Sequence, residues 1–238
     1  MMKSRLFILI LIGIFLASFA SAYSFSGGNG TSINPYQITN WTGLNATRDD
    51  LTAYYILMNN LTGDDLDYIS LGNNWTPIGT CGPEAECWSA DYSYTFTGNF
   101  DGNSNTISDL VINQPDLSDV GLFGVSTGNI SNIGLIDINV TGYQRVAGLV
   151  GYQLDGSIIN SYSVGTIFGY NAGGLVGVQY GSITNSYSTG NVSSSDSNAG
   201  GLVGLQYGFI TNSYSTGSVT GVNYIGGLVG AQWGGFYH

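Results

Sequence analysis

The sequence predicts an all-β protein, a single-stranded parallel β-solenoid with coils of about 26 residues and a short helix capping its N-terminal end. Three observations predict this fold. A Gly-Leu-Val-Gly motif recurs at a constant interval, a second segment of each repeat alternates with period two, and 37 glycines accompany a hydrophobic fraction of 43%. A chain with that many apolar side chains can bury a core, so its low complexity does not indicate disorder.

The interval is that of one coil. The motif occurs four times after a variant, Gly-Leu-Phe-Gly, and its successive leucines are 27, 26, 27 and 26 residues apart. These leucines are Leu122, Leu149, Leu175, Leu202 and Leu228. A period in the twenties held this tightly is typical of a solenoid in which each repeat forms one coil.

The second segment of each repeat predicts a strand. In residues 182–188, Ser-Ile-Thr-Asn-Ser-Tyr-Ser, the Ile, Asn and Tyr residues occupy alternate positions, so we expect them on one face and Ser and Thr on the other. Coils stacked about 4.8 Å apart then place the asparagines in an interior ladder, each amide donating to one neighbour and accepting from the other. The predicted structural ladders are Asn132, Asn160, Asn185 and Asn212, and Tyr162, Tyr187 and Tyr214.

The Gly-Leu-Val-Gly strand is not oriented by this argument. Alternation leaves apolar groups on both of its faces, and either face could be the core. A glutamine follows two residues after each copy and predicts one more structural row: Gln153, Gln179, Gln206 and Gln232.

The first 22 residues resemble a signal peptide. Lys3 and Arg5 precede an apolar run at 6–16, and Ala20-Ser21-Ala22 supplies small residues before the expected cleavage site. A retained membrane anchor is the alternative, but the run is shorter than the roughly 20 residues that span a bilayer. We therefore expect a secreted or cell-surface protein.

Two parts follow the leader. Residues 23–118 form an N-terminal capping part of the solenoid, with strands expected at 35–38, 54–61 and within 96–112, a short helix after Asn40, and an inserted cysteine loop at 80–94. Residues 119–238 form the repeat solenoid, whose last repeat is incomplete. A bare last coil exposes unpaired backbone groups, so we expect self-association through this uncapped C-terminal coil.

Charge limits the partners. Without the leader only Arg48 and Arg145 oppose 15 carboxylates, which gives a net charge of 2 − 15 = −13. No basic patch exists to neutralise phosphates, so nucleic acid is excluded as a partner. Other surface proteins or glycans are the partners that remain.

Cys81 and Cys87 are the two cysteines, and in an exported chain a disulfide between them is expected. A metal pair is the alternative, but the sole histidine is His238, so a zinc site lacks ligands. Residues 101–105 have the oxygen spacing of a calcium loop but lack its later Gly and Glu, which favours a simple turn. We expect no metal and no cofactor.

The repeats resemble a known family. Gly-Leu-Val-Gly followed by Ser-Ile-Thr-Asn-Ser-Tyr-Ser-Thr-Gly-Asn-Val is similar to the GLUG motif repeat of bacterial and archaeal surface proteins, some of which are immunoglobulin-A-cleaving metallopeptidases or adhesins. The N-terminal part adds weaker similarity at 35–38, 75–79 and 96–103. The resemblance implies a β-helical stalk or adhesin-like module. It does not imply peptidase activity, which a separate zinc domain carries in such proteins.

The residue composition favours a structural or binding role over an enzymatic one. One histidine excludes a His-Glu-x-x-His peptidase and a Ser-His hydrolase, so we expect no enzyme. A β-helical polysaccharide hydrolase using the aspartates at 49–50 or 64–67 is the enzymatic alternative. We expect an adhesive or structural surface module, and secondly a carbohydrate-binding module with Tyr180, Tyr207 and Trp233 as sugar platforms.

Sequons for glycosylation are Asn29, Asn40, Asn45, Asn60, Asn74, Asn129, Asn139 and Asn191.

Overall fold

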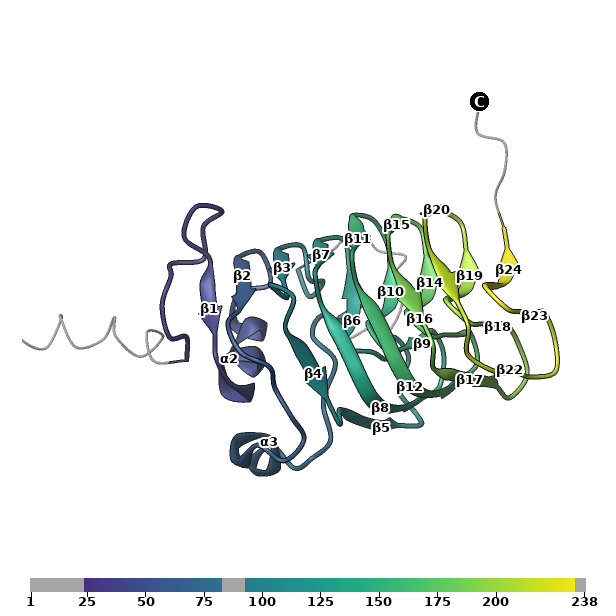
Figure 1. Ribbon diagram of the computed structural model, residues 1–238, viewed down its shortest axis with the longest axis horizontal. Helices are drawn as coiled ribbons and strands as arrows, with labels where there is room; N and C mark the ends of the chain where they lie inside the picture. Colours follow the sequence, from purple (N-terminus) through teal and green to yellow (C-terminus); the bar gives the residue numbers. More distant parts are fainter. Residues whose placement is uncertain (1–23, 83–92, 234–238) are drawn as a thin grey trace, which may run out of the picture.

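A computed structural model describes residues 24–82 and 93–233, and it is a parallel β-solenoid whose coils stack along one axis (Figure 1). The all-β solenoid predicted from the sequence is therefore confirmed. All pairings between its named strands are parallel, and the strands of the Gly-Leu-Val-Gly motif pair in register from coil to coil. The pairing of residues 134–141 with 162–168 contains one register shift, between Ser163 and Gly165. The leader at 1–22 lies outside the described residues. Within the described part of the chain, no helix is long and apolar enough to cross a membrane.

Four sheets, as far as residues 24–82 and 93–233 define them, form the walls of the solenoid. The first sheet contains β1 Tyr36–Ile38, β2 Tyr54–Leu57, β3 Asn99–Asp101, β7 Asn129–Ser131, β11 Ser157–Ile159, β15 Ser182–Thr184 and β20 Phe209–Thr211. The second contains β4 Thr106–Ser108, β5 Val111–Gln114, β8 Gly134–Gly142, β12 Tyr162–Gly169, β16 Tyr187–Ser188, β17 Asn191–Ser194, β21 Tyr214–Ser215 and β22 Val219–Thr220. The third contains β9 Val146–Ala147, β13 Ala172–Gly173, β18 Ala199–Gly200 and β23 Ile225–Gly226. The fourth contains β6 Phe123–Ser126, β10 Val150–Gln153, β14 Val176–Gln179, β19 Val203–Gln206 and β24 Val229–Gln232.

The helical segments lie at the N-terminal end (Figure 1). Helix α2 spans Trp41–Asn45, and its N-cap Asn40 accepts a hydrogen bond from the backbone N–H of Gly43 at 2.9 Å, which satisfies one of the unpaired donors of the first turn. A 3-10 turn, Ala46–Asp49, continues it. A second helix, α3, spans Leu66–Ser70 and was not predicted, because five residues are too few to show a helical stripe.

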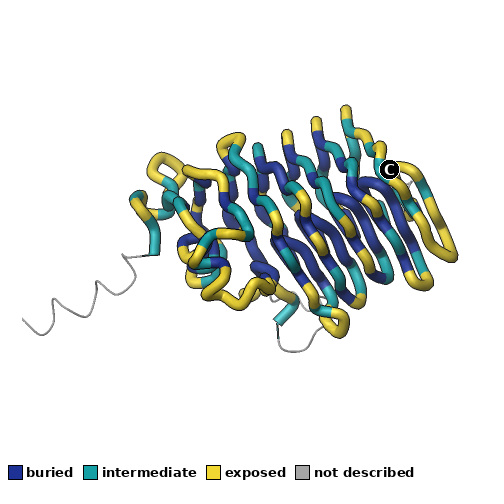
Figure 2. The backbone as a smooth tube through the Cα atoms, turned by 60° about the horizontal axis from the view of Figure 1, so that its bottom comes forward, coloured by how far each residue is buried: buried dark blue, intermediate teal, exposed yellow. Residues whose placement is uncertain are grey.

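The first sheet joins the two parts of the chain. Strands β1, β2 and β3 of the capping part pair in sequence with β7 and then with the repeat strands. The residues before 119 therefore form the first coils of the same stack. The buried core runs without a break along the interior (Figure 2).

The glycines of the motif allow opposite walls to touch. A Cβ on Gly174 would lie 2.1 Å from the hydroxyl of Ser188, which projects from the second sheet. A Cβ on Gly177 would lie 2.6 Å from the backbone carbon of Arg145 in the coil before. Both distances are shorter than van der Waals contact, so the interior is too narrow here for any larger residue.

The structure also orients the Gly-Leu-Val-Gly strand. Both apolar residues of the motif belong to the main core, as Leu175 and Val176 are each 0% exposed. The next apolar position, Val178, packs in a second, smaller cluster with Val125 and Tyr152. All four residues of β14 are buried, so both faces of this strand are covered.

Candidate functional site

The asparagine ladder is hydrogen-bonded but not buried. Asn185 Nδ2 donates to Asn160 Oδ1 at 3.4 Å, Asn160 Nδ2 donates to Asn132 Oδ1 at 3.1 Å, and Asn132 Nδ2 donates to Asp101 Oδ1 at 2.9 Å. The amides form a directional chain that ends on a carboxylate. Asn160, Asn185 and Asn212 are exposed, so the expected interior position is wrong.

The error has a backbone cause. Asn132, Asn160, Asn185 and Asn212 have φ between 48° and 55°, the left-handed region that asparagine tolerates better than most residues. A left-handed residue turns the chain and shifts the alternation by one position. After it, Ser161 and Ser163 are buried and Tyr162 points outward, whereas period two had placed them the other way.

The interior polar rows are serines and glutamines. Ser186 Oγ accepts from the backbone N–H of Ser161 at 3.1 Å and donates to the carbonyl of Thr184 at 2.9 Å. Gln179 is 0% exposed, and its Nε2 donates to the carbonyl of Phe209 in the next coil at 3.0 Å. The glutamine row was expected from the sequence, whereas the inner serine row was not. The serines and the glutamine amide groups, and not the asparagines, make the interior side-chain hydrogen bonds, although the Oε1 atoms of Gln153 and Gln179 have no hydrogen-bond partner among the described residues.

Two outward rows of tyrosine are stacked. Tyr162, Tyr187 and Tyr214 lie with ring centroids 4.8 and 5.0 Å apart and nearly parallel. Tyr180 and Tyr207 are 4.3 Å apart at 4°. Stacking covers ring faces and leaves edges to solvent, so Tyr180, which also meets the Tyr152 ring at 6.0 Å, offers little open face to a sugar. Trp233 is 59% exposed in the last coil.

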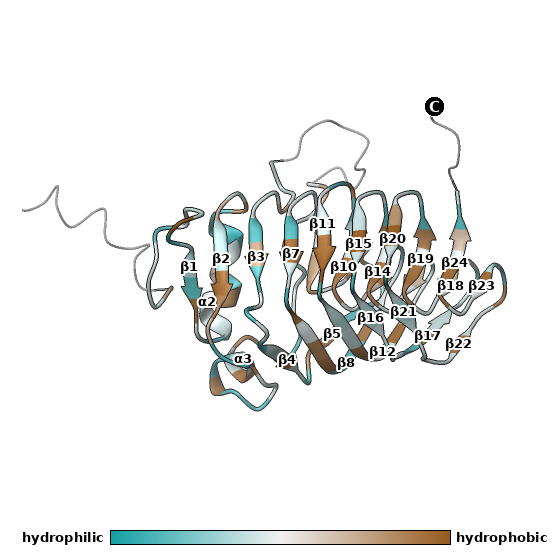
Figure 3. Cartoon of the chain, turned by 45° about the horizontal axis from the view of Figure 1, so that its top comes forward, coloured by the Kyte–Doolittle hydropathy of each residue, from teal (hydrophilic) through white to brown (hydrophobic). Residues whose placement is uncertain are grey.

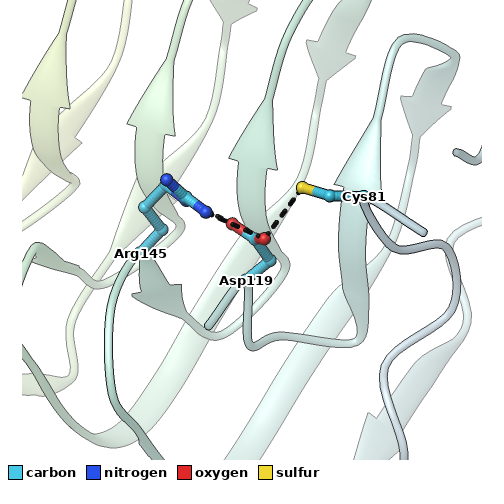
Figure 4. Close-up of polar contacts among 3 residues, drawn as sticks. All are labelled: Cys81, Asp119 and Arg145. Carbon is cyan, nitrogen blue, oxygen red and sulfur yellow. Dashed lines mark hydrogen bonds and ion pairs between the residues drawn. The ribbon is translucent and has the colours of Figure 1, made fainter. Parts of the chain in front are cut away.

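An ion pair joins two successive coils near the start of the repeat part (Figure 4). The guanidinium of Arg145 donates from Nε to Asp119 Oδ1 and from Nη2 to Asp119 Oδ2, the latter at 3.0 Å, and it lies over the Tyr152 ring. Burial raises the pKa of Asp119, and Arg145 opposes that shift. The two residues are 26 positions apart, one coil period, which is the sequence signal that could have revealed the pair.

The sulfur of Cys81 lies 3.1 Å from Asp119 Oδ2 (Figure 4). Cys87 and most of the predicted loop at 80–94 lie outside the described residues. The disulfide between Cys81 and Cys87 therefore stays a prediction.

Comparison with known proteins identifies the repeats. The family described as the GLUG motif matches residues 142–167, 168–193 and 195–220. This chain carries three GLUG motifs. Each match spans one coil of the stack.

Two relatives are similar to part of this chain, and one of them is named as a membrane protein. Halomucin of Haloquadratum walsbyi is 35% identical over 156 residues, which is 63% of this chain and 2% of halomucin. A candidate Gly-rich membrane protein of Evansella cellulosilytica is 34% identical over 125 residues, 51% of this chain and 13% of that protein. The chain thus spans a small fraction of either relative.

A solved structure shares the fold. A candidate immunoglobulin A1 protease from Bacteroides ovatus aligns with a TM-score of 0.67 and 25% sequence identity over 88% of this chain and 65% of that one. The likeness extends beyond the three GLUG motifs into the capping part.

Three of the five aspartates considered for catalysis accept hydrogen bonds from backbone N–H groups. Asp67 Oδ2 accepts from the backbone N–H of Thr42 at 2.8 Å, Asp65 Oδ2 accepts from that of Thr62 at 2.8 Å, and Asp50 Oδ1 accepts from that of Thr52 at 3.0 Å. These bonds close turns and helix ends. Residues 101–105 also form a turn, in which Asp101 Oδ1 accepts from the N–H of Asn103 at 2.8 Å. Among the described residues no three His, Cys, Asp or Glu side chains are grouped to hold a metal.

Proposed function

We propose that this chain is an exported, non-catalytic module of a cell surface, a stiff GLUG solenoid with a structural or adhesive role. The observation that carries the proposal is the stack itself, in which backbone bonds, the asparagine chain and the serine and glutamine rows all run from coil to coil. Such a one-dimensional stack suits a stalk or an adhesive surface. The similarity to halomucin and to a Gly-rich membrane protein supports the same proposal.

The absence of catalysis is part of the proposal. Asp119, the most buried carboxylate among the described residues, is neutralised by Arg145, and the aspartates at 50, 65 and 67 close local turns. Carboxylates engaged in this way are poorly placed to act as a general acid and base pair.

Beads coated with residues 23–238 test this role. We expect them to adhere to cells or to immobilised surface glycoprotein, and we expect the free protein to cleave neither peptides nor polysaccharides in a substrate panel. A matched preparation unfolded by Leu175→Asp, at a fully buried core position, should lose adhesion. Turnover that purifies with the folded chain contradicts the proposal.

Export has its own test. We propose cleavage after Ala22, a disulfide between Cys81 and Cys87, and glycosylation of exposed sequons such as Asn60 and Asn74. Mass spectrometry of the protein recovered from its source should find Tyr23 at the N-terminus, no free thiol and added hexose mass. An intact leader with two alkylated cysteines overturns this part.

Carbohydrate binding is the second candidate function. The observation in its favour is the exposed ring of Trp233, which occupies in the last coil the position that the stacked Tyr180 and Tyr207 hold in the two coils before it. A glycan array, repeated after replacing each of the three rings by alanine, tests it. Signals that vanish with these rings support this row as the platform.

A further inference from the structure

A pocket of about 220 Å³ lies on the outer side of the first sheet, near the N-terminal end. Its floor is formed by β2, β3 and β7, and its wall by the loop that contains Ser32 and Pro35. Strands β3 and β7 are coloured as mainly hydrophilic in Figure 3, whereas β11 and β20 further along the sheet carry more apolar residues. The pocket thus lies on the polar section of this sheet.

Strand register brings three kinds of side chain together there. Tyr54 pairs with Asn99, and Asn99 pairs with Asn129 on the next strand, about 4.8 Å away. Asp101 follows Asn99 by two residues on the same strand, so both side chains lie on one face about 7 Å apart. An aromatic ring, an amide and a carboxylate therefore line one small pocket.

Hydrogen bonds within the protein determine which donor of the amide and which acceptor of the carboxylate remain available to a ligand. Asn129 Nδ2 donates to Asn99 Oδ1 at 3.0 Å, so Asn99 keeps its Nδ2 as a donor. Asp101 Oδ1 accepts from Asn132 Nδ2 and from the N–H of Asn103, whereas no hydrogen bond between described residues uses Asp101 Oδ2. The pocket presents one oriented donor and one oriented acceptor.

The wall and the ring are preformed. The backbone N–H of Tyr54 donates to the carbonyl of Gly30 at 2.9 Å, which ties the loop to β2. Gly30 has φ of 75° and lies against the Tyr36 ring, where a Cβ would come within 2.4 Å. Tyr54 is 38% exposed and, in contrast to Tyr180, stacks on no other described ring.

We propose that this pocket binds one neutral hexose unit of a glycan. Tyr54 covers the apolar face of the sugar ring, Asp101 Oδ2 accepts a hydrogen bond from one hydroxyl, and Asn99 Nδ2 donates to its neighbour. No cation lines the pocket, so the charge of Asp101 repels uronic and sialic acids. The inference rests on the adhesive function proposed above and names its ligand class.

Saturation-transfer NMR with residues 23–238 and free glucose, galactose, mannose and glucuronate tests the pocket. We expect binding of at least one neutral hexose with a dissociation constant of about 1 mM and none of glucuronate. Tyr54→Ala should weaken the hexose at least about ten-fold, the equivalent of about 1.4 kcal/mol. Asp101→Asn keeps an oxygen that can accept the hydrogen bond from Asn132. It should also weaken hexose binding, and it should reduce the difference in affinity between neutral hexoses and glucuronate.

Tyr143→Ala is the matched control, because Tyr143 is 54% exposed and lies outside the pocket. It should bind as the parent does. Hexose binding that survives Tyr54→Ala but disappears in Tyr207→Ala places the sugar on the stacked row and overturns the pocket, while carbohydrate binding stands. No binding of any hexose overturns the inference alone, because adhesion of the coated beads is measured separately.

Discussion

Two core columns of the solenoid hold aromatic rings before residue 124, whereas in the GLUG repeats the same two columns hold aliphatic side chains. One column runs from Tyr55 and Phe100 to Ile130, Ile158 and Ile183. A second runs from Phe123 to Val150, Val176 and Val203. The backbone strands pair in the same parallel way throughout, but the side chains in these two core columns differ between the two parts.

This difference shows that the two parts place different packing requirements on their core side chains. In the repeats, each side chain of these two columns packs against the same type of side chain on the neighbouring strand. Isoleucine and valine pack well in such rows. The capping part must fit unlike layers to one another and to two helices, so it uses rings in unique contacts such as Trp41 on Tyr68 at 4.2 Å. We expect single substitutions to cost more where the contacts are unique.

Trp75→Ala should be the most damaging of the changes considered. Trp75 is 2% exposed, donates from Nε1 to the carbonyl of Leu122 at 3.1 Å, and lies under the Arg48 guanidinium. We expect a loss of about 3–5 kcal/mol in the free energy of unfolding by denaturant. Val176→Ala in a repeat layer should cost less, and the opposite order would contradict the comparison.

The Asp119–Arg145 pair joins two successive coils and comes next. Asp119→Ala leaves a buried guanidinium without its partner, at a cost of about 3 kcal/mol. The double variant with Arg145→Met should cost clearly less than the sum of the two single changes, because it strands no charge. Additive losses in a double-mutant cycle would mean that the pair does not couple.

Within a repeat, the inner serine should matter more than the outer asparagine. Ser186→Ala leaves the buried N–H of Ser161 unpaired, a loss of about 1–3 kcal/mol. Asn185→Ala should cost about 1 kcal/mol, chiefly from the left-handed backbone, and Asn185→Gly should recover part of it. If thermal unfolding shows Asn185→Ala to be the worse of the two, the asparagine is the interior residue after all.

The sequence could predict this much of the fold for a physical reason. Stacking of like coils appears in the sequence as a period of 26 or 27 residues. Asn40 could be predicted as an N-cap because its side-chain oxygen accepts a hydrogen bond from a backbone N–H in the first turn of the helix. The period-two argument failed where Asn185 and its equivalents turn left-handed, since alternation assumes extended backbone at all positions. The pocket could not be read, because Tyr54, Asn99 and Asp101 are brought together by strands that share no motif.

Alkaline pH should give a smaller effect shared by both parts. Burial raises the pKa of Tyr55 and Tyr68 in the capping part and of Tyr187 and Tyr207 in the stacked rows. These groups hold their protons more tightly when folded. Their stabilisation is therefore complete below the unfolded pKa of about 10 and is lost as pH rises through the folded values.

Melting temperature against pH checks this expectation. We expect a plateau up to about pH 9 and a decline above it, with a shallower decline in Tyr55→Phe. A melting temperature that rises with alkaline pH would have the wrong sign for the whole set.

The capping part and the GLUG repeats form one continuous stack, and native-state amide hydrogen exchange tests this continuity most directly. We predict unbroken protection from β2 to β19. The last coil should exchange fastest, since Leu228 is 37% and Ile225 42% exposed whereas Leu202 and Ala199 are fully buried. Protection of that coil should rise with protein concentration if it pairs with a second copy. A capping part that exchanges as a separate unit, with a break in protection between β3 and β7, would contradict the account.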